Sequence, residues 1–274
     1  MASTDDAGRR GRLPPPAQRE RPLRAVAFDL DGTLYLGHEV VPGAPRIVRD
    51  IRESGLRALF LTNSTTADAT QLADRLAKLG IAAVTDEIYS SATATARYVA
   101  ERGYEVAYIV GSPGLRGEVA SRGVRLTDRG SEAQALVVGY VPGFDAATLP
   151  DDFRPDCEFV AANLDVDYPV EGGARLPGCR QTVERVAARL GRGHDVVVGK
   201  PGTYLLECVE RDLGLTAGEI VVVGDNATSD VAMADAAGCR SILIAPRSEA
   251  DGAASVTIDR LTDLPAALSA LVGS

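Results

Sequence analysis

Short apolar runs alternate along most of the chain with longer segments whose apolar residues recur every three to four positions. The first pattern predicts buried strands, and the second predicts helices that cover a sheet. We expect strands at residues 24–29, 56–62, 219–224 and 240–245. We expect helices at residues 44–54, 67–79, 91–102, 203–213 and 230–237. Such alternation predicts an α/β fold with a doubly wound parallel sheet and helices on both faces.

The middle of the chain has a different pattern. Strands are expected at residues 106–111, 135–139 and 158–162, separated by irregular Asp-, Pro- and Gly-rich segments such as 141–155 and 165–178. Structureless loops of that length are unusual inside one compact sheet. We therefore predict a second α/β unit, inserted into the first. The predicted limits are 23–103 and 186–274 for the core, and 104–185 for the insertion.

Composition excludes several classes of protein. Of the 274 residues 45% are hydrophobic, enough for one large domain or two small ones, and no run of eighteen apolar residues predicts a membrane span. Residues 1–22 lack both periodicity and a signal-like apolar stretch, so we expect a disordered extension. A net charge of −9 without a long basic run in the folded part argues against nucleic-acid binding. Four widely spaced cysteines favour reduced thiols in a cytoplasm.

Polar residues follow four of the apolar runs. They are Asp29 and Asp31 after the run 24–29, Thr62, Asn63 and Ser64 after the run 56–62, Lys200 after a further predicted core strand at 196–198, and Asp225 and Asp230 after the run 219–224. Ligands of open parallel sheets bind at the carboxyl ends of the strands. If these strands are parallel, the four sets meet at one edge of the sheet and form one site.

Each set also has a purely structural explanation. Asp and Gly are common in turns, and Asn and Ser are good helix caps. A calcium loop of the EF-hand type is excluded, because its fifth, sixth and twelfth positions hold Thr33, Leu34 and Val40, and the loop needs a glycine at the sixth and a glutamate at the twelfth. A lysine, several acids and a hydroxyl–amide pair at the ends of four apolar runs together favour a functional site.

The residue types suit phosphoryl transfer through a covalent intermediate. Two carboxylates two positions apart are costly at a strand end unless a cation binds there. An aspartate can attack phosphorus, Mg²⁺ takes oxygen ligands, and the charge on the moving phosphoryl group needs fixed donors. Lys200 is one of only two lysines among 29 basic residues, and lysine is a compact point charge.

Four motifs in order carry a family resemblance: Asp29-Leu-Asp-Gly-Thr33, Leu61-Thr-Asn-Ser64, Gly199-Lys-Pro201 and Gly224-Asp-Asn-Ala-Thr-Ser-Asp230. From about residue 23 to about 265, the chain resembles the haloacid-dehalogenase superfamily of phosphatases, in the branch of NagD-like and p-nitrophenyl-phosphatase-like proteins. The resemblance implies a Rossmann-like core with an α/β cap of the C2 type inserted between the second and third motifs. Such a cap would close over the site, exclude water and select the leaving group.

The resemblance also implies roles for the four acids. Asp29 is expected to be the nucleophile and Asp31 the general acid/base. Mg²⁺ is expected to be held by Asp29, by Asp225 and by Asp31 through its backbone carbonyl. Asp230 is expected to hold the water shell of the metal or Lys200.

The remaining residues would bind substrate. The Thr62 hydroxyl and the Asn63 backbone are expected to bind the phosphoryl group, and Lys200 to neutralise Asp29 and the phosphoryl oxygens. The loop 163–179 is the expected substrate contact of the cap. The candidates there and directly after it are Asn163, Asp165, Asp167, Tyr168, Arg175 and Arg180.

The predicted function is a Mg²⁺-dependent phosphomonoesterase of a small phosphorylated metabolite, such as a sugar phosphate, phosphoglycolate, pyridoxal phosphate or a nucleoside monophosphate. The alternatives are a phosphomutase or phosphotransferase, a metal-independent dehalogenase, and a non-catalytic binding protein. A dehalogenase would not need Asp31 and Asp225, and the intact motif residues argue against a binding protein. Relatives often dimerise through the cap, so a homodimer is an open alternative to a monomer. No membrane or nucleic-acid partner is expected.

Overall fold

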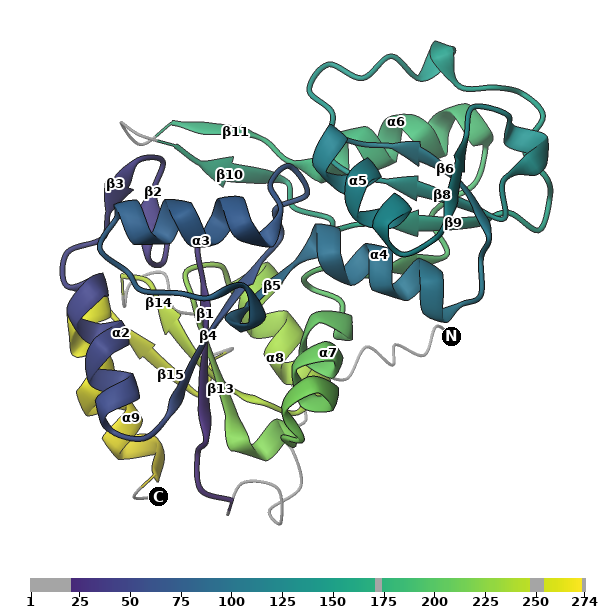
Figure 1. Ribbon diagram of the computed structural model, residues 1–274. Coiled ribbons are helices and arrows are strands. Elements are labelled where there is room, and N and C mark those ends of the chain that lie inside the picture. Colours follow the sequence, from purple (N-terminus) through teal and green to yellow (C-terminus); the bar gives the residue numbers. More distant parts are fainter. Residues whose placement is uncertain (1–20, 171–173, 247–253, 273–274) are drawn as a thin grey trace, which may run out of the picture.

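The computed structural model has two lobes (Figure 1), and it describes residues 21–170, 174–246 and 254–272. Residues 1–20 of the predicted N-terminal extension lie outside this part of the chain. The larger lobe is built from the first and last thirds of the chain, and the smaller, teal lobe from the middle third. We call them the core and the cap.

The core contains a six-stranded parallel sheet. Its order is β15 (Val256–Ile258), β14 (Arg240–Ile244), β13 (Ile220–Gly224), β1 (Ala25–Asp29), β4 (Arg57–Thr62) and β5 (Ile88–Ser90). The central strand β1 is buried along its whole length, as expected for a parallel strand covered on both faces. The core strands predicted at residues 24–29, 56–62, 219–224 and 240–245 are confirmed, whereas the short edge strands β5 and β15 were not predicted.

Helices cover both faces of this sheet (Figure 1). They are α2 (Ala44–Glu53), α3 (Ala69–Lys78), α4 (Ser91–Glu101), α7 (Tyr204–Leu213), α8 (Ala232–Ala237) and α9 (Leu264–Val272). Alternate residues of β1 belong to different apolar clusters: Ala27 packs with residues of α4, α7 and α8, and Phe28 with residues of α2, α3 and α9. The predicted doubly wound architecture is therefore confirmed. The last predicted helix differs, because a π-helical turn, Ala227–Val231, precedes α8.

The cap has its own five-stranded parallel sheet. Its order is β12 (Val196–Val197), β9 (Glu158–Ala161), β8 (Ala135–Val138), β6 (Val106–Val110) and β7 (Arg125–Thr127). Two helices belong to it, α5 (Pro113–Ser121) and α6 (Cys179–Leu190). The segment 165–178 was expected to be irregular, and this was wrong. It contains an antiparallel hairpin of β10 (Asp167–Pro169) and β11 (Arg175–Pro177).

The strand before Lys200 joins a different sheet from the one we predicted. The apolar run 196–198 was expected to lie in the core, but β12 pairs with β9, with Val197 opposite Ala161. The apolar pattern shows that a strand is buried, but not which neighbour it pairs with. In addition, α6 crosses the predicted limit between residues 185 and 186. We therefore propose that the cap runs from about residue 104 to about residue 198.

Two small features complete the fold. A second hairpin, β2 (Tyr35–Leu36) with β3 (Glu39–Val40), follows β1 directly. In Figure 1 the β10–β11 hairpin extends from the cap over this end of the core. All four cysteines are buried free thiols, and no helix among the described residues is long and apolar enough for a membrane span.

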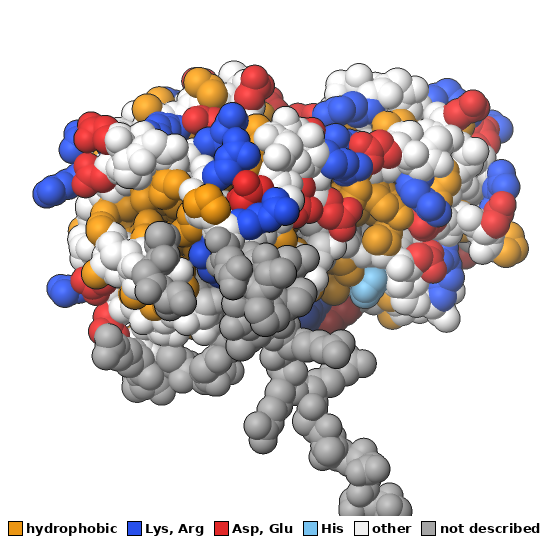
Figure 2. All heavy atoms as spheres, turned by 90° about the horizontal axis from the view of Figure 1, so that it is seen from below, with side chains coloured by type: hydrophobic (Ala, Val, Ile, Leu, Met, Phe, Trp, Pro, Cys, Tyr) orange, Lys and Arg blue, Asp and Glu red, His pale blue; other side chains and the backbone are white. Residues whose placement is uncertain are grey.

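The surface carries charges of both signs. On the face in Figure 2, Lys and Arg side chains are interspersed with Asp and Glu. Many arginines of the protein are paired, such as Arg97 with Asp212 at 2.7 Å and Arg211 with Glu101 at 2.8 Å. These are pairs of partly exposed side chains, which contribute little to stability individually.

One apolar cluster continues from the core into the cap. It joins Leu61 of β4 and Val99 of α4 to Leu115 of α5 and to Ile109 and Val137 of the cap sheet. The cap is therefore attached to the core by shared packing as well as by its two chain connections.

Leu115→Ala tests this shared cluster. Leu115 is fully buried, so its truncation should lower the free energy of unfolding by about 2–5 kcal/mol, measured by urea denaturation. The control is Leu176→Ala in the β10–β11 hairpin, where the side chain is 44% exposed and the loss should stay below about 0.5 kcal/mol. Equal losses in the two variants would contradict a shared core.

Candidate active site

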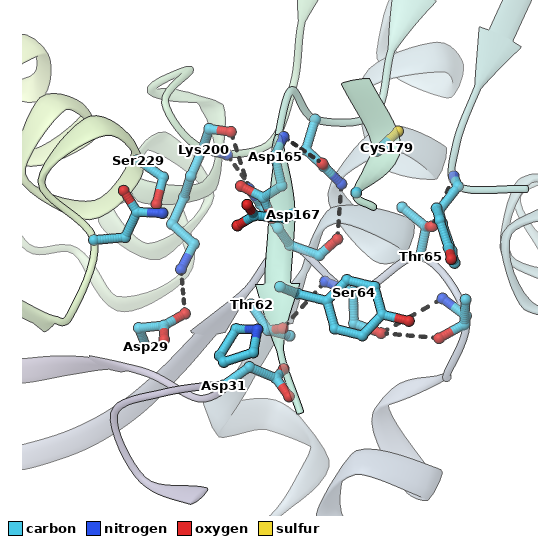
Figure 3. A pocket seen from close by; sticks show the side chains of 18 of the residues that line it. Asp29, Asp31, Thr62, Ser64, Thr65, Asp165, Asp167, Cys179, Lys200 and Ser229 are labelled. Carbon is cyan, nitrogen blue, oxygen red and sulfur yellow. Dashed lines mark hydrogen bonds and ion pairs between the residues drawn. The ribbon is translucent and has the colours of Figure 1, made fainter. Parts of the chain in front are cut away.

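A cavity of about 200 Å³ lies between the carboxyl ends of the core strands and the cap (Figure 3). The predicted residues that line it are Asp29, Asp31, Thr62, Asn63, Asn163, Asp165, Asp167, Tyr168, Arg175, Lys200 and Asp225. Asp230 is not among the lining residues and accepts a hydrogen bond from the Lys200 ammonium. Arg180 does not line the cavity, so the expectation that it brings charge to the substrate is not supported. Its exposed guanidinium donates to the Leu164 carbonyl at 3.2 Å.

The Lys200 ammonium is the centre of this site. It is 2% exposed and donates to a carboxylate oxygen of Asp29, to Asp230 Oδ1 at 2.7 Å and to the Leu61 carbonyl at 3.3 Å. Its three donors are therefore all used. Burial alone would lower the pKa of Lys200, but the charges of Asp230 and Asp29 raise it above its ordinary value. The lysine is therefore a fixed positive charge at every pH of interest.

The single positive charge of Lys200 cannot balance the carboxylates around it. Carboxylate oxygens of Asp29, Asp225 and Asp230 all lie within 4.8 Å of one another. Burial raises the pKa of Asp29, Lys200 opposes that shift, and the charges of Asp230 and Asp225 add to it. Burial, followed by the charge of Asp230, raises the pKa of Asp225 to about 6. An all-oxygen cluster with excess negative charge has the donor chemistry of a Mg²⁺ site.

Two motif glycines allow this crowding. Gly32 has φ +99°, and a Cβ there would overlap the Asp225 carboxylate. A Cβ on Gly224 would likewise overlap the carboxylate of Asp230. A side chain at either position would displace an acid of the cluster, so the sequence needs glycine at both.

Asp31 faces another part of the cavity. Burial raises its pKa, while Arg75 and Lys200 lower it, and Tyr35 Oη lies 3.4 Å from Asp31 Oδ2. The Arg75 guanidinium lies 4.2 Å from the centroid of the buried Tyr35 ring and donates to the Gly37 carbonyl at 2.5 Å. We did not predict Tyr35 or Arg75. Arg75 lies on an amphipathic helix, where a basic residue has no sequence signal that separates it from surface arginines.

The segment after β4 is not used to cap the next helix. Its polar residues could have served as helix caps, but α3 is capped by Asp68, which accepts from the Gln71 N–H at 2.8 Å. The Thr62 hydroxyl accepts a hydrogen bond from the Ser64 N–H at 3.1 Å. Its own proton is therefore still available to a ligand in the cavity.

The cap supplies a wall of aromatic and charged side chains. The Tyr140 and Tyr168 rings meet edge to face, with centroids 5.9 Å apart. Arg175 and Asp167 form an ion pair of 2.6 Å across the β10–β11 hairpin. Tyr140 was missed by the sequence analysis, since it follows β8 in a segment without any recognisable motif.

Comparison with known proteins shows the family of this chain. A family model described as Haloacid dehalogenase-like hydrolase matches residues 26–125, and a second HAD-hydrolase-like model matches residues 197–269. The chain is 32% identical to rat chronophin over 234 residues, which cover 80% of this chain and 75% of that protein. The chain belongs to the haloacid-dehalogenase superfamily.

Other relatives refine the placement within this superfamily. The chain is 30% identical to the 5′-nucleotidase YutF of Bacillus subtilis, over 81% of this chain and 86% of that protein. It is 30% identical to mouse glycerol-3-phosphate phosphatase, over 80% and 77% of the two chains. The structure of the p-nitrophenyl phosphatase of Archaeoglobus fulgidus has a TM-score of 0.81 at 27% identity, and covers 90% of this chain and 100% of that chain. The predicted family, branch and fold class are therefore confirmed.

The acid cluster predicts a pH-dependent affinity for Mg²⁺. A cation must displace the proton of Asp225, so binding strengthens as the pH rises through about 6 and levels off above it. We expect the Kd for Mg²⁺ at pH 5 to be about tenfold weaker than at pH 7.5, by isothermal titration calorimetry. Asp225→Asn should bind more weakly and lose most of this dependence. Equal affinities at the two pH values would contradict the assignment.

Proposed function

We propose that this protein is a Mg²⁺-dependent phosphomonoesterase that hydrolyses a small phosphorylated metabolite through an aspartyl-phosphate on Asp29. The observation that carries the proposal is the Asp29 carboxylate, held by the buried Lys200 ammonium in a cavity that also contains Asp31. Relatives named as glycerol-3-phosphate phosphatase and 5′-nucleotidase support hydrolysis of a phosphomonoester.

The reaction uses the two motif aspartates in turn. An Asp29 oxygen bonds to phosphorus as the bond to the leaving oxygen breaks, and Asp31 gives its proton to that oxygen. Burial raises the pKa of Asp31, which favours the protonated form needed for this step. Water then attacks the phosphorus of the aspartyl-phosphate, Asp31 takes the proton of that water, and Asp29 is released with inorganic phosphate.

Fixed donors hold the phosphoryl group. The free proton of the Thr62 hydroxyl and the Asn63 backbone N–H are the proposed donors, and the Lys200 ammonium, whose three protons are already bonded, contributes its positive charge. Asp230, the second carboxylate bound to the ammonium, helps to keep it in place. Mg²⁺ would be held by the Asp29 and Asp225 carboxylates and the Asp31 carbonyl, and would offset charge on the transferring group.

The cap is proposed to select the leaving group. A cavity of about 200 Å³ suits a small metabolite, and its cap wall combines Tyr168 and Arg175, which suit a leaving group with a flat or an anionic part. We also propose a cytoplasmic location, because all four cysteines are buried free thiols. Dimerisation through the cap stays a prediction.

Asp29→Asn tests the nucleophile. The amide cannot attack phosphorus, so kcat should fall at least about a thousandfold while the far-UV spectrum is unchanged. Asp74→Asn, an exposed carboxylate on α3, is the matched control and should leave kcat unchanged. Retained turnover in Asp29→Asn would overturn the assignment of the nucleophile.

A substrate screen tests the reaction class. Phosphate release should be found with one or more of glycerol 3-phosphate, nucleoside monophosphates, phosphoglycolate, pyridoxal phosphate, sugar phosphates and p-nitrophenyl phosphate. EDTA should stop the release and excess Mg²⁺ should restore it. Metal-independent release of halide from a 2-haloacid would instead favour the dehalogenase alternative, and phosphate transfer to an added sugar the phosphotransferase.

A further inference from the structure

The side chain of Asn63 makes four hydrogen bonds. Each of its two N–H protons donates one, and each of the two lone pairs of its oxygen accepts one. Its Oδ1 accepts from the Lys200 N–H at 2.8 Å and from Ser91 Oγ at 2.9 Å. Its Nδ2 donates to the Lys200 carbonyl at 3.0 Å and to Asp165 Oδ1 at 2.9 Å. One amide therefore holds both backbone groups of Lys200, as a neighbouring strand would.

Lys200 needs such a partner because it does not extend a strand of the core sheet. The strand before it, β12, pairs with β9 of the cap, and Gly199 N–H donates to the Ala162 carbonyl at 2.7 Å. A Cβ on Gly199 would lie 2.6 Å from Asn63 Oδ1, so the absence of a side chain there lets the amide approach. Lys200 thus crosses from cap to core, and the Asn63 amide binds its backbone at that crossing.

Residues of both lobes form hydrogen bonds with the Asn63 amide. Ser91 is fully buried at the start of α4 in the core. Asp165 lies in the cap, and the neighbouring Asn163 donates through Nδ2 to the Asn63 carbonyl at 2.8 Å and accepts from the Asp165 N–H at 3.1 Å. Asn163 is 2% exposed. These two cap residues line the cavity and are also hydrogen-bonded to the core, and Figure 3 shows Asp165 beside Lys200. Their predicted contact with substrate stays a prediction.

We propose that the Asn63 side chain is a positioning residue for Lys200, and that Asp165 of the cap and Ser91 of the core keep it in place. The amide fixes the Lys200 backbone so that the ammonium meets Asp29. The bond to Asp165 makes this placement depend on the position of the cap over the site. The catalytic consequence rests on the function proposed above, whereas the placement of the Lys200 backbone does not.

Amide exchange tests the placement without any reaction. In the full-length protein without metal or substrate, the Lys200 N–H should exchange at least about tenfold faster in Asn63→Ala than in the parent, measured by NMR. The Val222 N–H in β13 is the internal reference and should not change. An unchanged Lys200 exchange rate would overturn the proposal, whether or not the protein is a phosphatase.

Asp165 variants test the catalytic consequence. Asp165→Ala removes the acceptor of the Asn63 amide, so kcat for the best substrate of the screen should fall about tenfold with little change in KM. Asp165→Asn keeps an acceptor oxygen and should lose several-fold less than Asp165→Ala. Asp156→Ala removes an exposed carboxylate of the cap and is the matched control, with kcat and KM unchanged. A rise in KM alone in Asp165→Ala, or equal losses in the two Asp165 variants, would mean that Asp165 contacts substrate and would overturn the proposal.

A swapped pair separates positioning from a general loss of packing. Asn63→Asp places a carboxylate against Asp165 and removes the donor to it, so kcat should fall at least about tenfold. Adding Asp165→Asn supplies an amide donor on the cap side, so the hydrogen bond forms again with donor and acceptor exchanged. The kcat of the double variant should therefore recover about tenfold. Additive losses in the double variant would contradict a direct coupling between the two residues.

Discussion

The buried ammonium of Lys200 between Asp29 and Asp230 is the interaction on which the rest of the site depends. Three carboxylates, two of them buried and one half-buried, lie near this one cation, so the cluster keeps an excess of negative charge. Such a cluster is not a device for stability, because desolvation cancels much of the attraction between buried charges. Under the proposed function the cluster would bind a cation and a phosphoryl group, and Gly32 and Gly224 let its acids approach one another.

The position of that lysine links the two lobes. Asp29 ends a core strand, whereas Lys200 follows a strand of the cap sheet, so the ion pair between them joins the two lobes. A shared apolar cluster and the Asn63 amide maintain this relation from two sides. Under the proposed function, this arrangement would couple substrate selection by the cap to catalysis in the core.

Most of the architecture could be predicted from apolar periodicity. Strands buried on both faces, such as β1 and β13, are continuous apolar runs, and the amphipathic helices between them have a clear period. The strands that were not predicted share one feature, which is their length. The edge strand β5 and the hairpin strands β10 and β11 are too short for a period, so tertiary pairing alone defines them.

The sequence by itself determined the motif residues, their order and the chemistry they can perform, because these follow from residue type and from the polar ends of apolar runs. Only the tertiary structure decided which sheet carries Lys200, that Asn163 and Asp165 are bound to the core, and that Arg180 lies outside the cavity. The physical reason is that strand pairing and side-chain hydrogen bonds join segments about a hundred residues apart, and a local pattern contains no information about such partners.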